Sequence, residues 1–148
     1  MGKSNKMPKI ETSNFKRLIG IWKTEGMILA DNGNSKLVGI DSYEFILDGN
    51  YILHKADVKM GNEKSETFEI IALDSSIEKA KLQYYNSKGE SGVMTSSLTK
   101  NNFKIKGDKI KFEGTINDEN TKLVGKWYLQ ADNDEWTDFI DLNLTKQN

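Results

Sequence analysis

The sequence predicts an all-β protein, a closed antiparallel up-and-down β-barrel of about ten strands with a short N-terminal helix plugging one end. Three observations predict this fold class. Short runs of alternating apolar and polar residues follow one another, separated by segments rich in Gly, Asn, Asp and Ser. No helical period returns after residue 20. A hydrophobic content of 36% with 29% charged residues suits strands that show one face to water.

The length of 148 residues is that of one domain that can bury a core of its own. Residues 1–11 are mostly polar and contain the only proline, Pro8. We expect them to form a disordered tail, which leaves residues 12–148 as a single barrel domain.

A short helix is expected just before the first strand. Thr12 or Ser13 can cap its start, and Gly20 ends it. Its apolar residues lie at positions i, i+3 and i+4 on one face and are Phe15, Leu18 and Ile19. We expect this face to cover the mouth of the barrel, with Trp22 packed beneath it.

The rest of the chain divides into strands and tight turns. Asp48-Gly49 and Gly107-Asp108 each join two alternating runs, which is typical of β-hairpins. All connections are short, so strands that follow one another should pair antiparallel. The expected strands cover residues 20–29, 37–47, 50–60, 65–74, 79–86, 91–99, 102–107, 109–116, 121–130 and 135–145.

Ten meandering strands either leave two open edges or close on themselves. Closure removes both edges, and a barrel of this size can enclose a cavity. Alternation then assigns one face of each strand to the interior. The candidate ligand-binding residues on these inner faces are Tyr43, Phe45, His54, Phe68, Tyr84, Met94, Phe112, Trp127 and Asp138.

The second strand breaks the simple alternation. Val38 and Ile40 lie on the face opposite Tyr43 and Phe45. We therefore expect a bulge near residues 41–42 that switches the inward face.

Several small residues also fall on the expected inner faces. They could leave room for a ligand, or they could mark bulges and tight curvature. The residues are Gly26, Ala56, Ala72, Gly92, Gly114 and Gly125.

His54 and Asp138 are the polar residues of greatest interest, because each is flanked by apolar residues on its face. A buried polar group needs a partner. His54 is either a hydrogen-bonding or acid–base group of the cavity, or a core histidine satisfied by a neighbouring Tyr or Asp or placed at the rim. A His54–Asp138 pair would be the one constellation able to support proton transfer.

Other classes of function find no support in the sequence. With 21 basic and 22 acidic residues the net charge is −1, which argues against a nucleic-acid partner. The sole arginine is Arg17, and there is no cysteine. The Asn- and Asp-rich clusters read as turns rather than calcium loops. We expect no catalytic motif, no metal site, no cofactor and no membrane insertion.

The N-terminus shows no apolar segment of signal-peptide length. A cytoplasmic location is therefore expected, although a secreted chain stripped of its leader would look the same. The oligomeric state cannot be predicted.

The segment "LIGIWKTEG", with Gly20-Ile21-Trp22, resembles the Gly-x-Trp signature at the first strand of the calycin superfamily. With "YEFILDGNYILHKADV" and "LDSSIEKAKLQYYNSKGE", it resembles a bacterial family of uncharacterised lipocalin-like β-barrel proteins over residues 15–145. The resemblance implies a ten-stranded barrel that binds a small hydrophobic molecule. Two features depart from better-known relatives: there are no interior arginines for a fatty-acid carboxylate, and no late histidine for haem iron.

Three hypotheses follow. The leading one is a binding protein that holds a hydrophobic, uncharged or weakly polar ligand inside the barrel. The second is a barrel enzyme, similar to an isomerase or cyclase, that uses His54 or Asp138 for proton transfer. The third is a structural or interaction protein whose barrel is packed solid.

Overall fold

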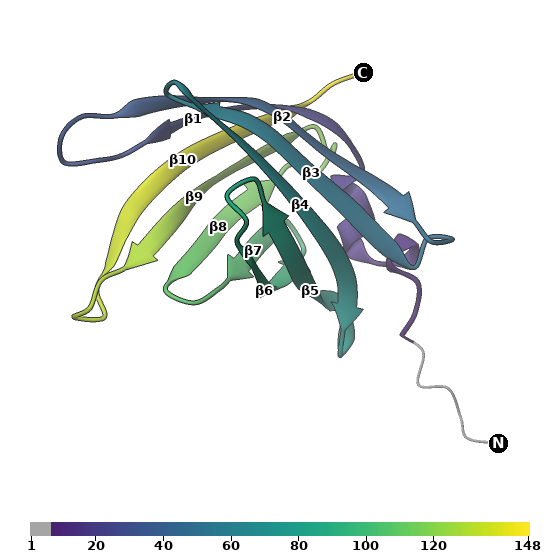
Figure 1. Ribbon diagram of the computed structural model, residues 1–148. Helices are drawn as coiled ribbons and strands as arrows, with labels where there is room; N and C mark the ends of the chain where they lie inside the picture. The colour runs from purple at the N-terminus through teal and green to yellow at the C-terminus, as the bar shows by residue number, and fades with distance from the viewer. Residues whose placement is uncertain (1–6) are drawn as a thin grey trace.

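The computed structural model describes residues 7–148, which form a closed antiparallel barrel of ten strands (Figure 1). Each strand pairs with its neighbours in sequence, and β1 pairs with β10 to close the sheet. The expected fold class is confirmed. The strands are β1 Gly20–Ile28, β2 Ser35–Ile46, β3 Tyr51–Met60, β4 Glu63–Asp74, β5 Ser76–Asn86, β6 Ser91–Thr99, β7 Asn102–Lys106, β8 Ile110–Ile116, β9 Lys122–Gln130 and β10 Trp136–Lys146.

The N-terminal plug consists of two 3-10 helices, η1 Ile10–Thr12 and η2 Asn14–Leu18, rather than one α-helix. Figure 1 shows them at one end of the barrel, beside the β2–β3 turn. Ser13 caps η2 as expected, because its side chain accepts a hydrogen bond from the backbone N–H of Phe15.

The packed chain begins earlier than the expected boundary at residue 12. Ile10 is fully buried and belongs to the hydrophobic core. Of the expected tail, residues 1–6 lie outside the described part of the chain.

Trp22 lies beneath the plug, where the Gly-x-Trp pattern places it. Phe15, Leu18 and Trp22 are all fully buried in one cluster. The indole N–H of Trp22 donates to the carbonyl of Leu18 over 2.8 Å, so the one polar atom of this ring is satisfied where the ring is buried. The plug and the first strand are thus joined by packing and by a hydrogen bond.

The barrel interior has two halves. Near the plug it is filled by apolar side chains with at most 2% exposure, which include Ile52, Ile71, Leu82, Leu98 and Ile116. Towards the opposite end, where the β3–β4, β5–β6 and β7–β8 turns lie, the interior opens into a cavity.

The second strand contains no bulge, contrary to expectation. Its register with β1 and β3 is continuous, and Leu37, Asp41 and Tyr43 all face inward. The apolar pair Val38 and Ile40 lies on the outer face, 43% and 45% exposed. The predicted bulge was wrong because Val38 and Ile40, although apolar, lie on the outer face of the strand.

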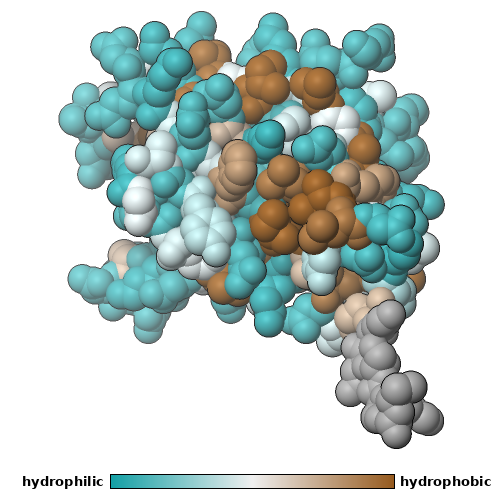
Figure 2. All heavy atoms as spheres, turned by 45° about the vertical axis from the view of Figure 1, so that its right-hand side comes forward, coloured by the Kyte–Doolittle hydropathy of each residue, from teal (hydrophilic) through white to brown (hydrophobic). Residues whose placement is uncertain are grey.

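The face of the molecule drawn in Figure 2 is mostly hydrophilic, with apolar side chains gathered among the polar ones. Large apolar residues exposed by more than 45% are Ile21, Leu47, Phe68, Ile77, Tyr85, Val93 and Val124. None of the helices formed by residues 7–148 has the length and apolar character needed to cross a membrane.

Candidate functional site

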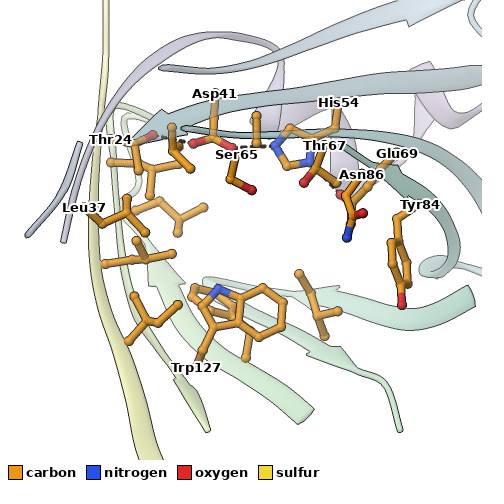
Figure 3. Close-up of a pocket in the computed structure, with 18 of the residues that line it drawn as sticks. Thr24, Leu37, Asp41, His54, Ser65, Thr67, Glu69, Tyr84, Asn86 and Trp127 are labelled. Carbon is orange, nitrogen blue, oxygen red and sulfur yellow. Dashed lines mark hydrogen bonds and ion pairs between the residues drawn. The ribbon is translucent and has the colours of Figure 1, made fainter. Parts of the chain in front are cut away.

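The candidate site is a cavity of about 360 Å³ inside the barrel. Figure 3 shows one wall formed by polar side chains from β1 to β5, including Thr24, Asp41, His54 and Glu69, and Trp127 of β9 on the opposite wall. The wall around Trp127 is apolar and includes Met94, Phe103, Ile105, Phe112, Leu123, Ile140, Leu142 and Leu144.

His54 is the centre of the polar wall. It faces inward from the middle of β3, and the strand register sets it between Tyr43 of β2 and Glu69 of β4. Its Nδ1 lies 2.5 Å from Oε1 of Glu69, and its Nε2 lies 2.6 Å from Oδ1 of Asp41. We call Asp41, His54 and Glu69 the charged trio.

The trio is shielded from water. The side chains of Asp41, His54 and Glu69 are 10%, 13% and 9% exposed. Thr24 donates its hydroxyl proton to Oδ2 of Asp41, and the ring of Tyr43 stacks on the imidazole with centroids 4.0 Å apart and planes at 5°. Each buried charge therefore has at least one direct partner, as burial requires.

These contacts keep the imidazole charged. Burial by itself lowers the pKa of His54, but the charge of Glu69, the hydrogen bonds to both carboxylates and the charge of Asp41 outweigh it. Together they raise the pKa of His54 from 6.5 to about 10. Burial, with the charges of Asp41 and Glu69, raises the pKa of the Tyr43 phenol well above its usual value. At neutral pH both ring nitrogens of His54 are therefore donors.

The trio as a whole is acidic. With both carboxylates ionised and the imidazole protonated, its net charge is −1. Among residues 7–148, no Lys or Arg lines the cavity. Arg17 lies at the plug instead, where its guanidinium contacts Asn101, Asn120 and two backbone carbonyls. The one cationic group that the described residues place at the cavity is thus the imidazolium of His54, and both of its N–H groups already contact carboxylates.

A metal site is not formed by these residues. The two carboxylates contact opposite nitrogens of one protonated ring, so neither nitrogen has a lone pair to offer. Within residues 7–148 no group of three His, Cys, Asp or Glu side chains converges as metal ligands.

Six of the nine residues expected from the sequence line the cavity. They are Tyr43, His54, Tyr84, Met94, Phe112 and Trp127. The other three, Phe45, Phe68 and Asp138, do not line it. Contact of any of the nine with a ligand stays a prediction.

Asp138 points outward because β10 contains a bulge. Asp138 pairs with Tyr128, whereas Ile140 pairs with Trp127, so Phe139 is an extra residue that reverses the alternation. The carboxylate of Asp138 is exposed and lies 2.9 Å from Nζ of Lys126. A His54–Asp138 pair, the constellation that could have supported proton transfer, is therefore not formed.

Phe68 lies on the outer face of β4, 50% exposed, with Nζ of Lys55 5.4 Å from its ring centroid. The inward residues of this strand include Thr67, Glu69 and Ile71. Because β4 carries apolar residues on both faces, its sequence pattern did not show which face is the inner one. Phe45 lies one residue before the end of β2, away from the cavity, and is 38% exposed.

Most of the small residues reflect close packing rather than space. A Cβ at Gly114 or Gly125 would meet the ring of Phe112, and a Cβ at Gly92 would meet Tyr84. Of the six small residues, Ala56 alone lines the cavity. The space beside these glycines is therefore taken up by neighbouring rings and backbone rather than left for a ligand.

Sequence reasoning missed Thr24, Asp41 and Glu69. Simple alternation with Leu37 and Tyr43 would have placed Asp41 inside. The bulge expected near residues 41–42 removed this continuous alternation, and the apolar residues on both faces of β4 left the side of Glu69 undecided.

No model of a known protein family matches the chain, and neither does any curated protein. Solved structures of similar shape do exist. The crystal structure of Rv2717c from M. tuberculosis has a TM-score of 0.72 at 10% identity, covering 96% of this chain and 99% of that chain. The S-type phycobiliprotein lyase CPES from Guillardia theta has a TM-score of 0.63 at 10% identity, covering 99% of each chain. At this identity the likeness is one of fold alone, and the fold of this protein is a closed ten-stranded antiparallel β-barrel.

Proposed function

We propose that the protein binds a small hydrophobic molecule, uncharged or weakly polar, inside its lipocalin-like barrel. The observation that carries the proposal is the cavity of about 360 Å³. It has the size, the largely apolar lining and the few convergent polar groups that are typical of small-molecule sites. A cavity of this volume also argues against the solid barrel of the third hypothesis.

The charges of the lining support the class of ligand. An anionic head group would meet a trio of net charge −1 and no free cation. A strongly polar ligand would leave many of its groups unpaired against the apolar wall. A hydrophobic body with few polar atoms fits both walls.

The enzyme hypothesis receives little support from the geometry. A general acid or base works best with a pKa near the working pH, and the pKa of His54 is about 10. Both of its N–H groups already contact carboxylates, and Asp138 lies on the outside.

Filling the cavity tests the proposal. Ala56→Leu adds a branched side chain to the lining, so the affinity for the neutral dye 1-anilinonaphthalene should fall about tenfold or more, which is about 1.4 kcal/mol. The fold should persist, because filling a cavity is commonly neutral or stabilising. Dye fluorescence during a titration measures the affinity.

Ala72→Leu is the matched control, because Ala72 lies on the outer face of β4 between the inward Ile71 and Leu73. It should bind the dye like the original protein. Equal dye binding by both variants, or no saturable binding by the original protein, would overturn the proposed function.

A further inference from the structure

One oxygen of the charged trio has no protein partner. Asp41 accepts hydrogen bonds at both oxygens, from Thr24 and from His54. Glu69 accepts one at Oε1 from His54. Its second oxygen, Oε2, accepts no hydrogen bond from residues 7–148. The side chain of Glu69 is nevertheless buried, with 9% of its surface exposed.

This oxygen faces the cavity. Glu69 belongs to the cavity lining, and among the described residues every fully enclosed side-chain N or O atom has a hydrogen-bond partner. An unpartnered oxygen of Glu69 is therefore open to the cavity. Figure 3 shows Glu69 on the polar wall, close to Thr67 and Asn86.

None of the neighbouring donors of residues 7–148 forms a hydrogen bond with Oε2 of Glu69. Both N–H groups of His54 contact carboxylates, and the hydroxyl of Thr24 donates to Asp41. One N–H of the Asn86 amide donates to Glu90, and the hydroxyl of Thr67, which also lines the cavity, forms no hydrogen bond with Glu69. A carboxylate oxygen can only accept, so the free position at Glu69 calls for a donor from the ligand.

The opposite wall has the complementary property. The indole N–H of Trp127 has no hydrogen-bond partner among the described residues, and Figure 3 shows its ring nitrogen turned towards the polar wall. An indole N–H can only donate. Trp127 can thus accommodate an acceptor atom of the ligand, while Glu69 requires a donor.

We propose that the cavity selects hydrophobic ligands whose head group donates a hydrogen bond to Oε2 of Glu69, such as an alcohol, over ligands that can only accept. This inference rests on the proposed function and names the class of ligand within it. A ligand that cannot donate would bury the carboxylate oxygen without a partner, which is costly.

Three compounds separate these properties: 1-decanol, its isomer methyl nonyl ether, and decanoate. The alcohol and the ether have the same atoms, but only the alcohol donates. A hydrogen bond to a charged group is worth more than one between neutral groups, so the alcohol should displace 1-anilinonaphthalene at a concentration at least about tenfold lower than the ether. Decanoate should also need a concentration at least about tenfold higher than the alcohol to displace the dye, because it is an anion and the trio is negatively charged.

A variant traces the selectivity to Glu69. In Glu69→Gln the amide can donate as well as accept, so the preference for alcohol over ether should fall to within about threefold. Glu66→Gln is the matched control, because Glu66 lies on the same strand and is exposed. It should keep the preference of the original protein.

The ranking in the original protein decides the inference even if Glu69→Gln fails to fold. Equal binding of the alcohol and the ether would overturn the preference for a donor and leave the proposed function intact. Tightest binding of decanoate would overturn the preference for a donor and also the uncharged class of ligand in the proposed function. Failure of all three compounds to displace the dye, with no saturable binding of the dye itself, would overturn both.

Discussion

The imidazolium of His54 links three neighbouring strands by hydrogen bonds. His54 of β3 contacts Asp41 of β2 and Glu69 of β4, and Tyr43 covers its ring. A one-residue slip of any of these strands would turn its member of the trio to the outside. The contacts therefore favour one strand register, in addition to forming the polar wall of the cavity.

The pKa of His54 predicts how stability depends on pH. The pKa of His54 in the folded protein, about 10, lies above the ordinary value of 6.5 for a free side chain. The stabilisation is therefore complete below pH 6.5 and is lost as the pH rises through about 10. Between these values the free energy of unfolding should fall by up to about 1.4 kcal/mol per pH unit. Urea unfolding at pH 7, 8 and 9 measures this slope.

The titration of the ring itself provides the check. His54 is the only histidine in the sequence, so its imidazole signals need no assignment. NMR should show a protonated ring at pH 8, with both nitrogens bearing protons. A midpoint near 6.5 would contradict the charged trio as described.

At the scale of elements, the plug is held by the only arginine. Arg17 of η2 donates to the side chains of Asn101 and Asn120 and to the backbone carbonyls of Lys100 and Asn117. These residues belong to the β6–β7 and β8–β9 connections. The planar guanidinium thus ties the N-terminal segment to two turns at the closed end of the barrel.

Replacing this arginine should affect stability and leave binding unchanged. Arg17→Lys keeps the charge but loses the fork of donors, so the free energy of unfolding should fall by about 1–3 kcal/mol. The affinity for 1-anilinonaphthalene should stay within about twofold, because Arg17 does not line the cavity. Urea unfolding and a dye titration on the same preparation measure the two quantities. A large loss of affinity at unchanged stability would place Arg17 in the binding site.

The sequence predicted the strands well because turns and alternation are local signals. The ten expected strands correspond to the ten observed ones, with ends shifted by up to three residues. Inward faces were harder to predict. The extra residue Phe139 reversed the face of Asp138, and no local pattern marks it. Because β4 carries apolar residues on both faces, its pattern did not show that Glu69 points inward. The partners of His54 lie on β2 and β4, and no local sequence pattern shows which of their residues face His54 in the folded barrel.

At the scale of the whole molecule, the barrel combines a filled half and an open half. Phe15, Leu18 and Trp22 fill the end under the plug, and the cavity lies towards the other end. Composition could not predict this division, because most of the small residues accommodate neighbouring rings or backbone. The volume of a cavity depends on how side chains from many strands pack against one another. The residue pattern of a single strand carries no information about this packing.

The central claim is that this open half holds a small molecule. Native mass spectrometry of freshly purified protein, beside a denatured sample of the same preparation, tests it most directly. We expect a small molecule that accompanies the native chain and is lost on denaturation, or a one-to-one adduct after incubation with 1-decanol. A bare chain of 16.8 kDa in both experiments would contradict the claim.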